Sequence, residues 1–152
     1  MAVGAIGELE NKTGSSLKIL VVDDDSLNQR MMNLILSREG YHVTIASNGV
    51  EAFEIAKSQE FDVILMDLQM PVWDGVTASR QIREWEKGRR HTFIVALTAS
   101  FLPEKGQELF EAGIDNYISK PFDLDHLRQI LLYSHADREN PEKTSIQEDT
   151  KV

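Results

Sequence analysis

The chain has 152 residues, of which 41% are hydrophobic and 27% charged, so it can form one compact domain and is not a wholly disordered chain. Its formal net charge of −9 argues against nucleic-acid binding, because a phosphate backbone requires a basic protein surface. The absence of cysteine excludes disulfides, thiolate catalysis and cysteine-based zinc sites.

The two ends of the chain differ in composition from its middle. Residues 1–16 are rich in Gly, Ser and other small residues, and residues 135–152 are polar and charged, so both are expected to be flexible tails. A folded domain is therefore expected at 17–134. Neither a signal peptide nor an apolar stretch of about 20 residues is present, which favours a cytoplasmic protein without membrane contact.

The folded region opens with a short apolar run at 18–22 and a helical pattern over 27–38. Ser26 is the expected N-cap of that helix. Its apolar positions recur at helical spacing and are Leu27, Met31, Leu34 and Ile35. An apolar run at 42–46 and a helical pattern at 49–58 come next.

The same alternation continues to the end of the domain. Strand-like runs and helical patterns follow one another at 62–66, 75–87, 93–97, 103–112, 116–119 and 123–133. Runs that are apolar on consecutive residues suit strands buried on both faces of a parallel sheet. Five strand–helix repeats predict an α/β fold of the doubly wound (βα)5 type, with helices on both faces of the sheet.

Polar residues follow four of the five predicted strands. Asp23, Asp24 and Asp25 come directly after the first strand, Asp67 after the third, Thr98 after the fourth and Lys120 after the fifth. In an open α/β sheet, ligands bind outside the carboxyl ends of the strands, at the point where the strand order reverses. These side chains are therefore expected to share one crevice.

The chemistry of this set of side chains is that of phosphoryl transfer. Carboxylates brought close together repel one another and need a cation, and oxygen ligands suit Mg2+, with Mn2+ as a substitute. Lys120 and Thr98 can contact phosphoryl oxygens. A carboxylate nucleophile beside a metal and a lysine is an arrangement for transfer to aspartate.

At these strand ends the sequence resembles the receiver domains of two-component response regulators. The matching stretches are ILVVDD at 19–24, MDLQMPVWDG at 66–75, LTA at 97–99 and YISKPF at 117–122. Asn28 and the Gln69-Met70-Pro71 segment further resemble the receivers of hybrid histidine kinases. The resemblance implies a flavodoxin-like sheet with strand order 2-1-3-4-5. It also leaves open whether the domain stands alone or is a fragment of a larger chain.

The resemblance also implies a role for each site residue. Asp67 would be the phosphoacceptor, and Asp23, Asp24, Asp67 and the backbone carbonyl of Gln69 would hold Mg2+. The residues expected to bind the phosphoryl group or to switch with it are Thr98, Ala99, Lys120 and Tyr117, with Pro121 following in a cis bond.

The implied partner is a histidine kinase or a histidine phosphotransfer protein. The implied output surface is the fourth helix, fifth strand and fifth helix. The domain would not be an enzyme, and it would show at most slow self-hydrolysis, because neither Gln69 nor Ser100 is a placed base. No organic cofactor is expected.

Two other functions remain open at this stage. A haloacid-dehalogenase-like phosphatase would use Asp23 and Asp25, whose spacing fits Asp-x-Asp. A receiver-like docking module would no longer accept phosphate. Three residues or segments also have plainer interpretations: Asp25 as a turn residue, Tyr117 as a core aromatic, and the basic run from Lys87 to His91 as a solvated loop.

Overall fold

The computed structural model describes residues 17–99, 103–120 and 124–139. The expected tail at 1–16 and residues 140–152 of the expected tail at 135–152 lie outside the described residues, as do Ser100 and Pro121. Residues 135–139 of that expected tail are helical instead. The chain divides into two compact units, Met1–Lys120 and Pro121–Val152. None of the helices in the described part of the chain is long and apolar enough to cross a membrane.

The first unit contains all five described strands, and helices alternate with them. Its elements are β1 (Lys18–Val22), α2 (Ser26–Arg38), β2 (His42–Ala46), α3 (Gly49–Ser58), β3 (Val63–Asp67), α4 (Gly75–Glu86), β4 (Phe93–Thr98), α5 (Pro103–Glu111) and β5 (Asn116–Ser119). The second unit contains α6 (Leu124–Glu139), in which Leu127, Ile130 and Leu131 are buried. This helix continues past residue 133, where the apolar pattern ends.

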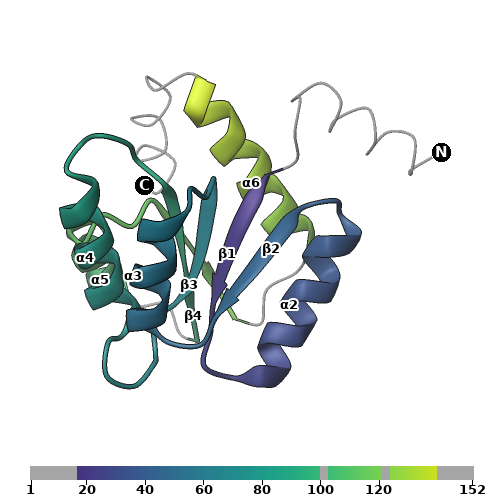
Figure 1. The fold of residues 1–152 in the computed structure, drawn as a ribbon, viewed down its shortest axis with the longest axis horizontal. Helices are drawn as coiled ribbons and strands as arrows, with labels where there is room; N and C mark the ends of the chain where they lie inside the picture. The colour runs from purple at the N-terminus through teal and green to yellow at the C-terminus, as the bar shows by residue number, and fades with distance from the viewer. Residues whose placement is uncertain (1–16, 100–102, 121–123, 140–152) are drawn as a thin grey trace. The chain divides into compact units, whose positions relative to one another are not determined.

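The five strands form one parallel sheet in the order β2-β1-β3-β4-β5, which confirms the predicted fold. The three central strands are buried almost throughout, whereas the edge strands β2 and β5 are only partly buried. Helix α2 lies on one side of the sheet, and α3, α4 and α5 lie on the other (Figure 1). Continuous apolar runs therefore marked the strands that are covered on both faces.

One hydrophobic core fills the space between the sheet and helices α3, α4 and α5. Alternate residues of the central strands point into it, as the period-2 geometry of a strand requires. They are Leu20, Val22, Ile64, Met66, Ile94 and Ala96. The helices contribute small and branched side chains, among them Ala52, Ala78 and Ile82. This packing fixes the positions of the strand ends that carry the polar residues.

Helix α2 differs from its prediction in its cap and in its buried face. Asp25, not Ser26, is the N-cap, because its Oδ1 accepts a hydrogen bond from the Leu27 N–H at 2.9 Å. The residues buried on this helix are Met32 and Leu36. Three of the four apolar positions that define the sequence pattern are instead exposed: Leu27 (62%), Met31 (51%) and Leu34 (58%). The helix is apolar around most of its circumference, so periodicity alone could not tell which face packs.

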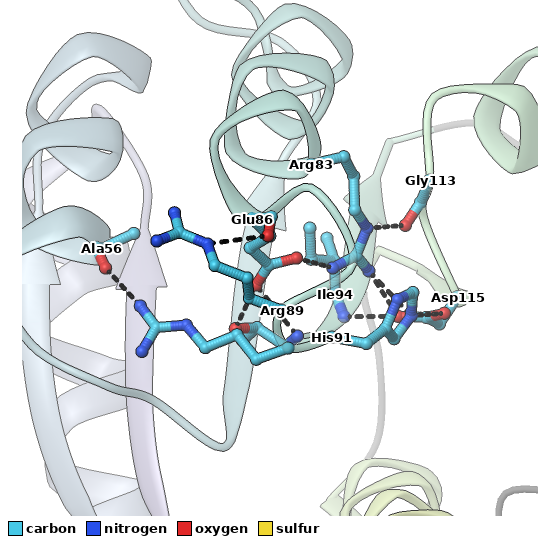
Figure 2. A network of polar contacts seen from close by, with 10 residues as sticks. Ala56, Arg83, Glu86, Arg89, His91, Ile94, Gly113 and Asp115 are labelled. Carbon is cyan, nitrogen blue, oxygen red and sulfur yellow. Dashed lines mark hydrogen bonds and ion pairs between the residues drawn. The ribbon is translucent and has the colours of Figure 1, made fainter.

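A network of polar contacts joins the end of α4 to the segments before β4 and β5 (Figure 2). The Arg83 guanidinium donates to Glu86 Oε1 at 2.7 Å, to Asp115 Oδ2 at 2.8 Å and to the Gly113 carbonyl at 2.9 Å. Glu86 is 2% exposed, and its Oε2 accepts from both the amide and the hydroxyl of Thr92. The network therefore neutralises a buried carboxylate at the amino-terminal side of β4.

The basic run after α4 is largely exposed, as expected of a solvated loop, and its side chains also make hydrogen bonds to this part of the fold. Arg89 donates to the carbonyls of Trp85 and Glu86, and Arg90 donates to the Ala56 carbonyl. His91 Nε2 lies 2.7 Å from Asp115 Oδ1. These intramolecular contacts give the basic side chains a structural role.

Candidate functional site

The carboxyl ends of four adjacent strands bring the predicted site residues together. Asp23 directly follows β1, Asp67 is the last residue of β3, Thr98 is the last of β4, and Lys120 directly follows β5. Strands β1, β3, β4 and β5 are consecutive neighbours in the sheet, and the strand order reverses at β1 and β3. Strands β3 and β4 each end one residue later than predicted, at Asp67 and Thr98. The reason is that strand pairing continues to Asp67↔Leu97 and Thr98↔Ser119.

Three carboxylates form the centre of the site. One oxygen from each of Asp23, Asp24 and Asp67 lies within 4.8 Å of the others. Asp23 is 2% exposed and Asp67 6% exposed, while Asp24 is exposed. Two buried carboxylates and one exposed carboxylate at this separation make a strongly negative pocket that is open on one side.

Lys120 reaches into the same cluster from the end of β5. Its Nζ lies 3.6 Å from Asp67 Oδ2 and 3.7 Å from Asp23 Oδ2. The Lys120 amide donates to the Thr98 carbonyl at 2.7 Å, which holds the ends of β4 and β5 together. A single ammonium cannot neutralise three carboxylates, so the pocket retains negative charge.

The environment of Asp67 raises its pKa above the ordinary aspartate value of 3.8. Burial is the main cause, since removing the carboxylate from water disfavours its charged form. The Gln69 amide, which donates to Asp67 Oδ1 at 3.1 Å, and the Lys120 ammonium lower the pKa. Repulsion by Asp23 and Asp24 raises it further. The positive charge of Lys120 therefore does not offset the burial of Asp67 and the repulsion by its neighbouring carboxylates.

The loop after Asp67 ends in a close approach between α4 and β3. Asp74 caps α4 by accepting a hydrogen bond from the Thr77 amide at 2.8 Å, so it is a helix-start residue and does not belong to the three-carboxylate group. A Cβ on Gly75 would collide with the backbone carbonyl of Asp67 and lie 2.9 Å from the Leu68 Cα. Only glycine lets the helix start this close to the acidic cluster.

Val72, in the same loop, adopts a left-handed backbone conformation with φ 68° and is 90% exposed. A β-branched residue is strained there because its Cβ substituents crowd the backbone. We expect Val72→Asn to raise the free energy of unfolding by about 1 kcal/mol, since Asn tolerates this region. Urea unfolding would measure the gain, with Val50→Asn, at another exposed valine, as the control. A lower midpoint for Val72→Asn would contradict the expectation.

The remaining predicted residues lie around this centre with different degrees of burial. Gln69 and Ala99 are exposed at the ends of β3 and β4. Tyr117 is half-buried and packs against the core cluster, as its plainer interpretation required. Asp25 is not in the three-carboxylate group; it caps α2. The phosphatase alternative needs Asp25 as a second catalytic acid, and its role as a cap removes that support.

Gln29 is a neighbour of the site that sequence reasoning missed. Its Nε2 donates to the Asp23 carbonyl at 2.6 Å and to Ser47 Oγ at 3.1 Å. Nothing in the sequence pattern marks this glutamine, because it is six positions from Asp23 and belongs to an ordinary helix turn. Only the crossing of α2 over the ends of β1 and β2 brings the groups together.

The comparison with protein families shows to which family the chain belongs. A family model described as the response regulator receiver domain matches residues 19–132, which include every residue of the acidic cluster. The chain belongs to the response regulator receiver domain family. This receiver domain therefore has the sheet order and the acidic strand ends that the sequence resemblance implied.

Three similar proteins show where such receiver domains occur. Hybrid signal transduction histidine kinase G of Dictyostelium discoideum is 41% identical over 117 residues, which cover 76% of this chain. A receiver domain of a Pseudomonas aeruginosa sensor histidine kinase, solved with magnesium in its active-site cleft, is 39% identical with a TM-score of 0.70. That alignment covers 77% of this chain and 95% of the other.

The third is a co-crystal structure from Saccharomyces cerevisiae of the histidine phosphotransfer protein Ypd1 and the receiver domain of Ssk1. Its match is 31% identical with a TM-score of 0.74, covering 81% of this chain and 91% of the other. Among full-length relatives, this receiver domain spans only 3% to 16% of the histidine kinases that it matches.

The acidic cluster of this receiver domain fits Mg2+ by its donor chemistry. Its ligand atoms are all carboxylate oxygens, the donors that Mg2+ prefers. Two of the carboxylates are buried, and burial, followed by repulsion from Asp23 and Asp24, raises the pKa of Asp67, so a bound cation would relieve an unfavourable charge arrangement.

Proposed function

We propose that Asp67 of this receiver domain accepts a phosphoryl group from a phosphohistidine with the assistance of Mg2+. The observation that carries the proposal is the convergence of Asp67, two further carboxylates and Lys120 on one pocket. In the transfer, a carboxylate oxygen of Asp67 forms a bond to phosphorus as the phosphorus–nitrogen bond breaks. The imidazole nitrogen keeps the electron pair of that bond and takes up a proton.

Each neighbouring side chain has a proposed part in this transfer. The Gln69 amide holds one oxygen of Asp67, which leaves Oδ2, on the Lys120 side, as the attacking atom. Lys120 is expected to move from the carboxylates to the phosphoryl oxygens, because its distances of 3.6 and 3.7 Å indicate weak ion pairs. Thr98 and Ala99, at the end of β4, would bind the remaining oxygens with a hydroxyl and an amide.

The proposed metal ligands are Asp23, Asp24, Asp67 and the backbone carbonyl of Gln69. When bound, Mg2+ would neutralise phosphoryl oxygens during the transfer, and Mn2+ is the expected substitute. Asp24 is the exposed member of the set and is proposed as a direct ligand, whereas buried Asp23 acts mostly through water.

The proposed partner is a histidine kinase or a histidine phosphotransfer protein. The relatives support this class, because they include hybrid histidine kinases and a receiver crystallised with a phosphotransfer protein. The exposed apolar residues Leu27, Met31 and Leu34 supply a surface for it. They are spaced by four and three positions on α2 and form one stripe that starts just after the acidic loop. A donor that reaches Asp67 would cover this stripe.

We expect Met31→Glu to slow transfer from a phosphohistidine protein at least tenfold, since a charge at the centre of an apolar contact costs about 1.4 kcal/mol or more. Phosphorylation by acetyl phosphate, which needs no docking surface, should keep its rate. Phe110→Glu, on the exposed face of α5, is the matched control and should affect neither reaction. Equal losses with both phosphodonors would count against α2 as the docking surface.

Further parts of the proposal concern output and boundaries. Phosphorylation is proposed to alter the surface that α5 and β5 contribute, with Thr98 and Tyr117 as the moving residues; a contribution from α6 stays a prediction. The domain is proposed to signal without turnover beyond slow self-hydrolysis.

Since α6 runs to Glu139, we place the C-terminal boundary of the domain after that residue and not at 134.

Incubation with acetyl phosphate and Mg2+, followed by intact-mass measurement and peptide mapping, tests the proposed function. One hydroxylamine-sensitive phosphoryl adduct is expected on the peptide that contains Asp67, and EDTA should prevent it. Failure to form any adduct, with Mg2+ binding intact, would favour the docking module. An adduct on the peptide that contains Asp23 would instead revive the phosphatase.

A further inference from the structure

The side-chain amide of Gln29 connects helix α2 to the ends of two strands. Its Nε2 carries two hydrogens, and each has an acceptor: the Asp23 carbonyl at 2.6 Å and Ser47 Oγ at 3.1 Å. Gln29 is half-buried on the first turns of α2, beside the acidic loop. The amide therefore makes two contacts outside its own helix.

Asp23 is held at each of its other polar groups as well. Its N–H donates to the Ala46 carbonyl at 3.1 Å, and its Oδ1 accepts from the Asp25 amide at 2.9 Å. Gln29 supplies the contact to its carbonyl. Because a peptide unit is planar, holding this carbonyl fixes the plane of the Asp23–Asp24 peptide and hence the direction in which Asp24 leaves the strand.

The other acceptor, Ser47, is itself held in place at the start of α3. The Ser47 amide donates to Glu51 Oε1 at 2.6 Å, and the Glu51 amide donates to the Asn48 side chain at 2.7 Å. These two bonds form a capping arrangement that fixes the first turn of α3. Gln29 therefore holds the acidic loop against a rigid helix start.

We infer that Gln29 is a positioning residue for divalent-cation binding at the acidic cluster. It acts through the backbone of Asp23 and sets the orientation of Asp24, the one exposed carboxylate of the group. Mg2+ requires near-octahedral geometry at short metal–oxygen distances, so a small rotation of this peptide weakens binding. The inference rests on the proposed function, because it concerns the same metal site.

Gln29→Met tests the inference, because methionine keeps the length of the side chain and removes both donors. Mg2+ titration by calorimetry should show a dissociation constant about tenfold higher than that of the wild type. At saturating Mg2+, the rate of phosphorylation by acetyl phosphate should return to the wild-type rate. Gln81→Met, at an exposed position on α4, should bind Mg2+ as the wild type does.

Several outcomes would overturn the inference and separate it from the proposed function. Unchanged Mg2+ affinity in Gln29→Met would show that Gln29 does not position the site. A rate that stays low at saturating Mg2+, with normal affinity, would indicate a merely structural role. Gln29→Ala, which also removes both donors and adds no charge, gives the same test should Gln29→Met fail to fold. A wild-type protein that binds no Mg2+ would refute the proposed function itself.

Discussion

Asp67→Asn is expected to abolish the phosphoryl adduct formed with acetyl phosphate and Mg2+, a loss of at least about a hundredfold given that the nucleophile is removed. Asparagine has nearly the shape of aspartate, and its side-chain oxygen can still accept the hydrogen bond from the Gln69 amide. The loss would therefore report chemistry and not the geometry of the loop. Intact-mass measurement after a fixed incubation provides the readout.

The same variant should be more stable than the wild type in EDTA. The raised pKa of Asp67 means that its ionised form is less favourable in the folded chain than in the unfolded chain. Above that raised pKa the charge costs stability, and as the pH falls through it, protonation in the folded state removes the cost. The stability difference between Asp67→Asn and the wild type should therefore narrow at low pH.

Two results would contradict this account of Asp67. An adduct that persists in Asp67→Asn would place the phosphoacceptor elsewhere. A variant less stable than the wild type at neutral pH in EDTA would show that the carboxylate is structurally favourable. Asp62→Asn serves as the control for phosphorylation, because Asp62 accepts a hydrogen bond from the Lys18 amide at the other end of the sheet. This variant should form the phosphoryl adduct as the wild type does.

Arg83→Ala is expected to lower the free energy of unfolding by about 3 kcal/mol, because it leaves a buried carboxylate without its counter-charge. Side-chain exposure is 16% for Arg83, 2% for Glu86 and 11% for Asp115, so water cannot replace the lost contacts fully. The guanidinium also covers Gly113, whose φ of 90° and lack of a side chain allow the close approach. Urea unfolding would measure the loss.

A matched control exists on the same helix. Glu84 and Lys87 form another ion pair at spacing i,i+3, but both are exposed, at 72% and 69%. Glu84→Ala should therefore change stability by no more than about 0.5 kcal/mol. Arg83→Lys should lose part of the stability, since an ammonium cannot bond Glu86, Asp115 and Gly113 at once. Equal effects of Arg83→Ala and Glu84→Ala would refute the importance of burial.

The central strands and the acidic cluster at their carboxyl ends could be predicted from residues alone. Val63 to Met66 is apolar on every residue, a pattern that only a strand covered on both faces explains, and Asp67 follows at once. Since parallel strands end at one edge of the sheet, the polar residues after them had to meet. The predicted helix boundaries were close to the observed ones, because helix caps such as Asp74 and the glycine at 75 are local signals in the sequence.

The buried face of α2 and the contacts of Arg83 could not be predicted in this way. Leu27, Met31 and Leu34 are as apolar as Met32 and Leu36, and which set is buried depends on how the helix lies against the sheet. Likewise, the basic run after α4 has the composition of a solvated loop. Its arginines are bound because carbonyls and carboxylates from distant segments lie beside them.

The sequence by itself determined the fold and the polar residues at the strand ends, because these depend on periodicity and on the residue types at fixed places along the chain. Only the tertiary structure decided the contacts between segments far apart in the sequence. The bond from Gln29 to Asp23, the burial of Glu86 and the exposed stripe on α2 are of this kind. Each depends on how a helix is oriented on the sheet, which is settled by packing over the whole core and has no local sequence signal.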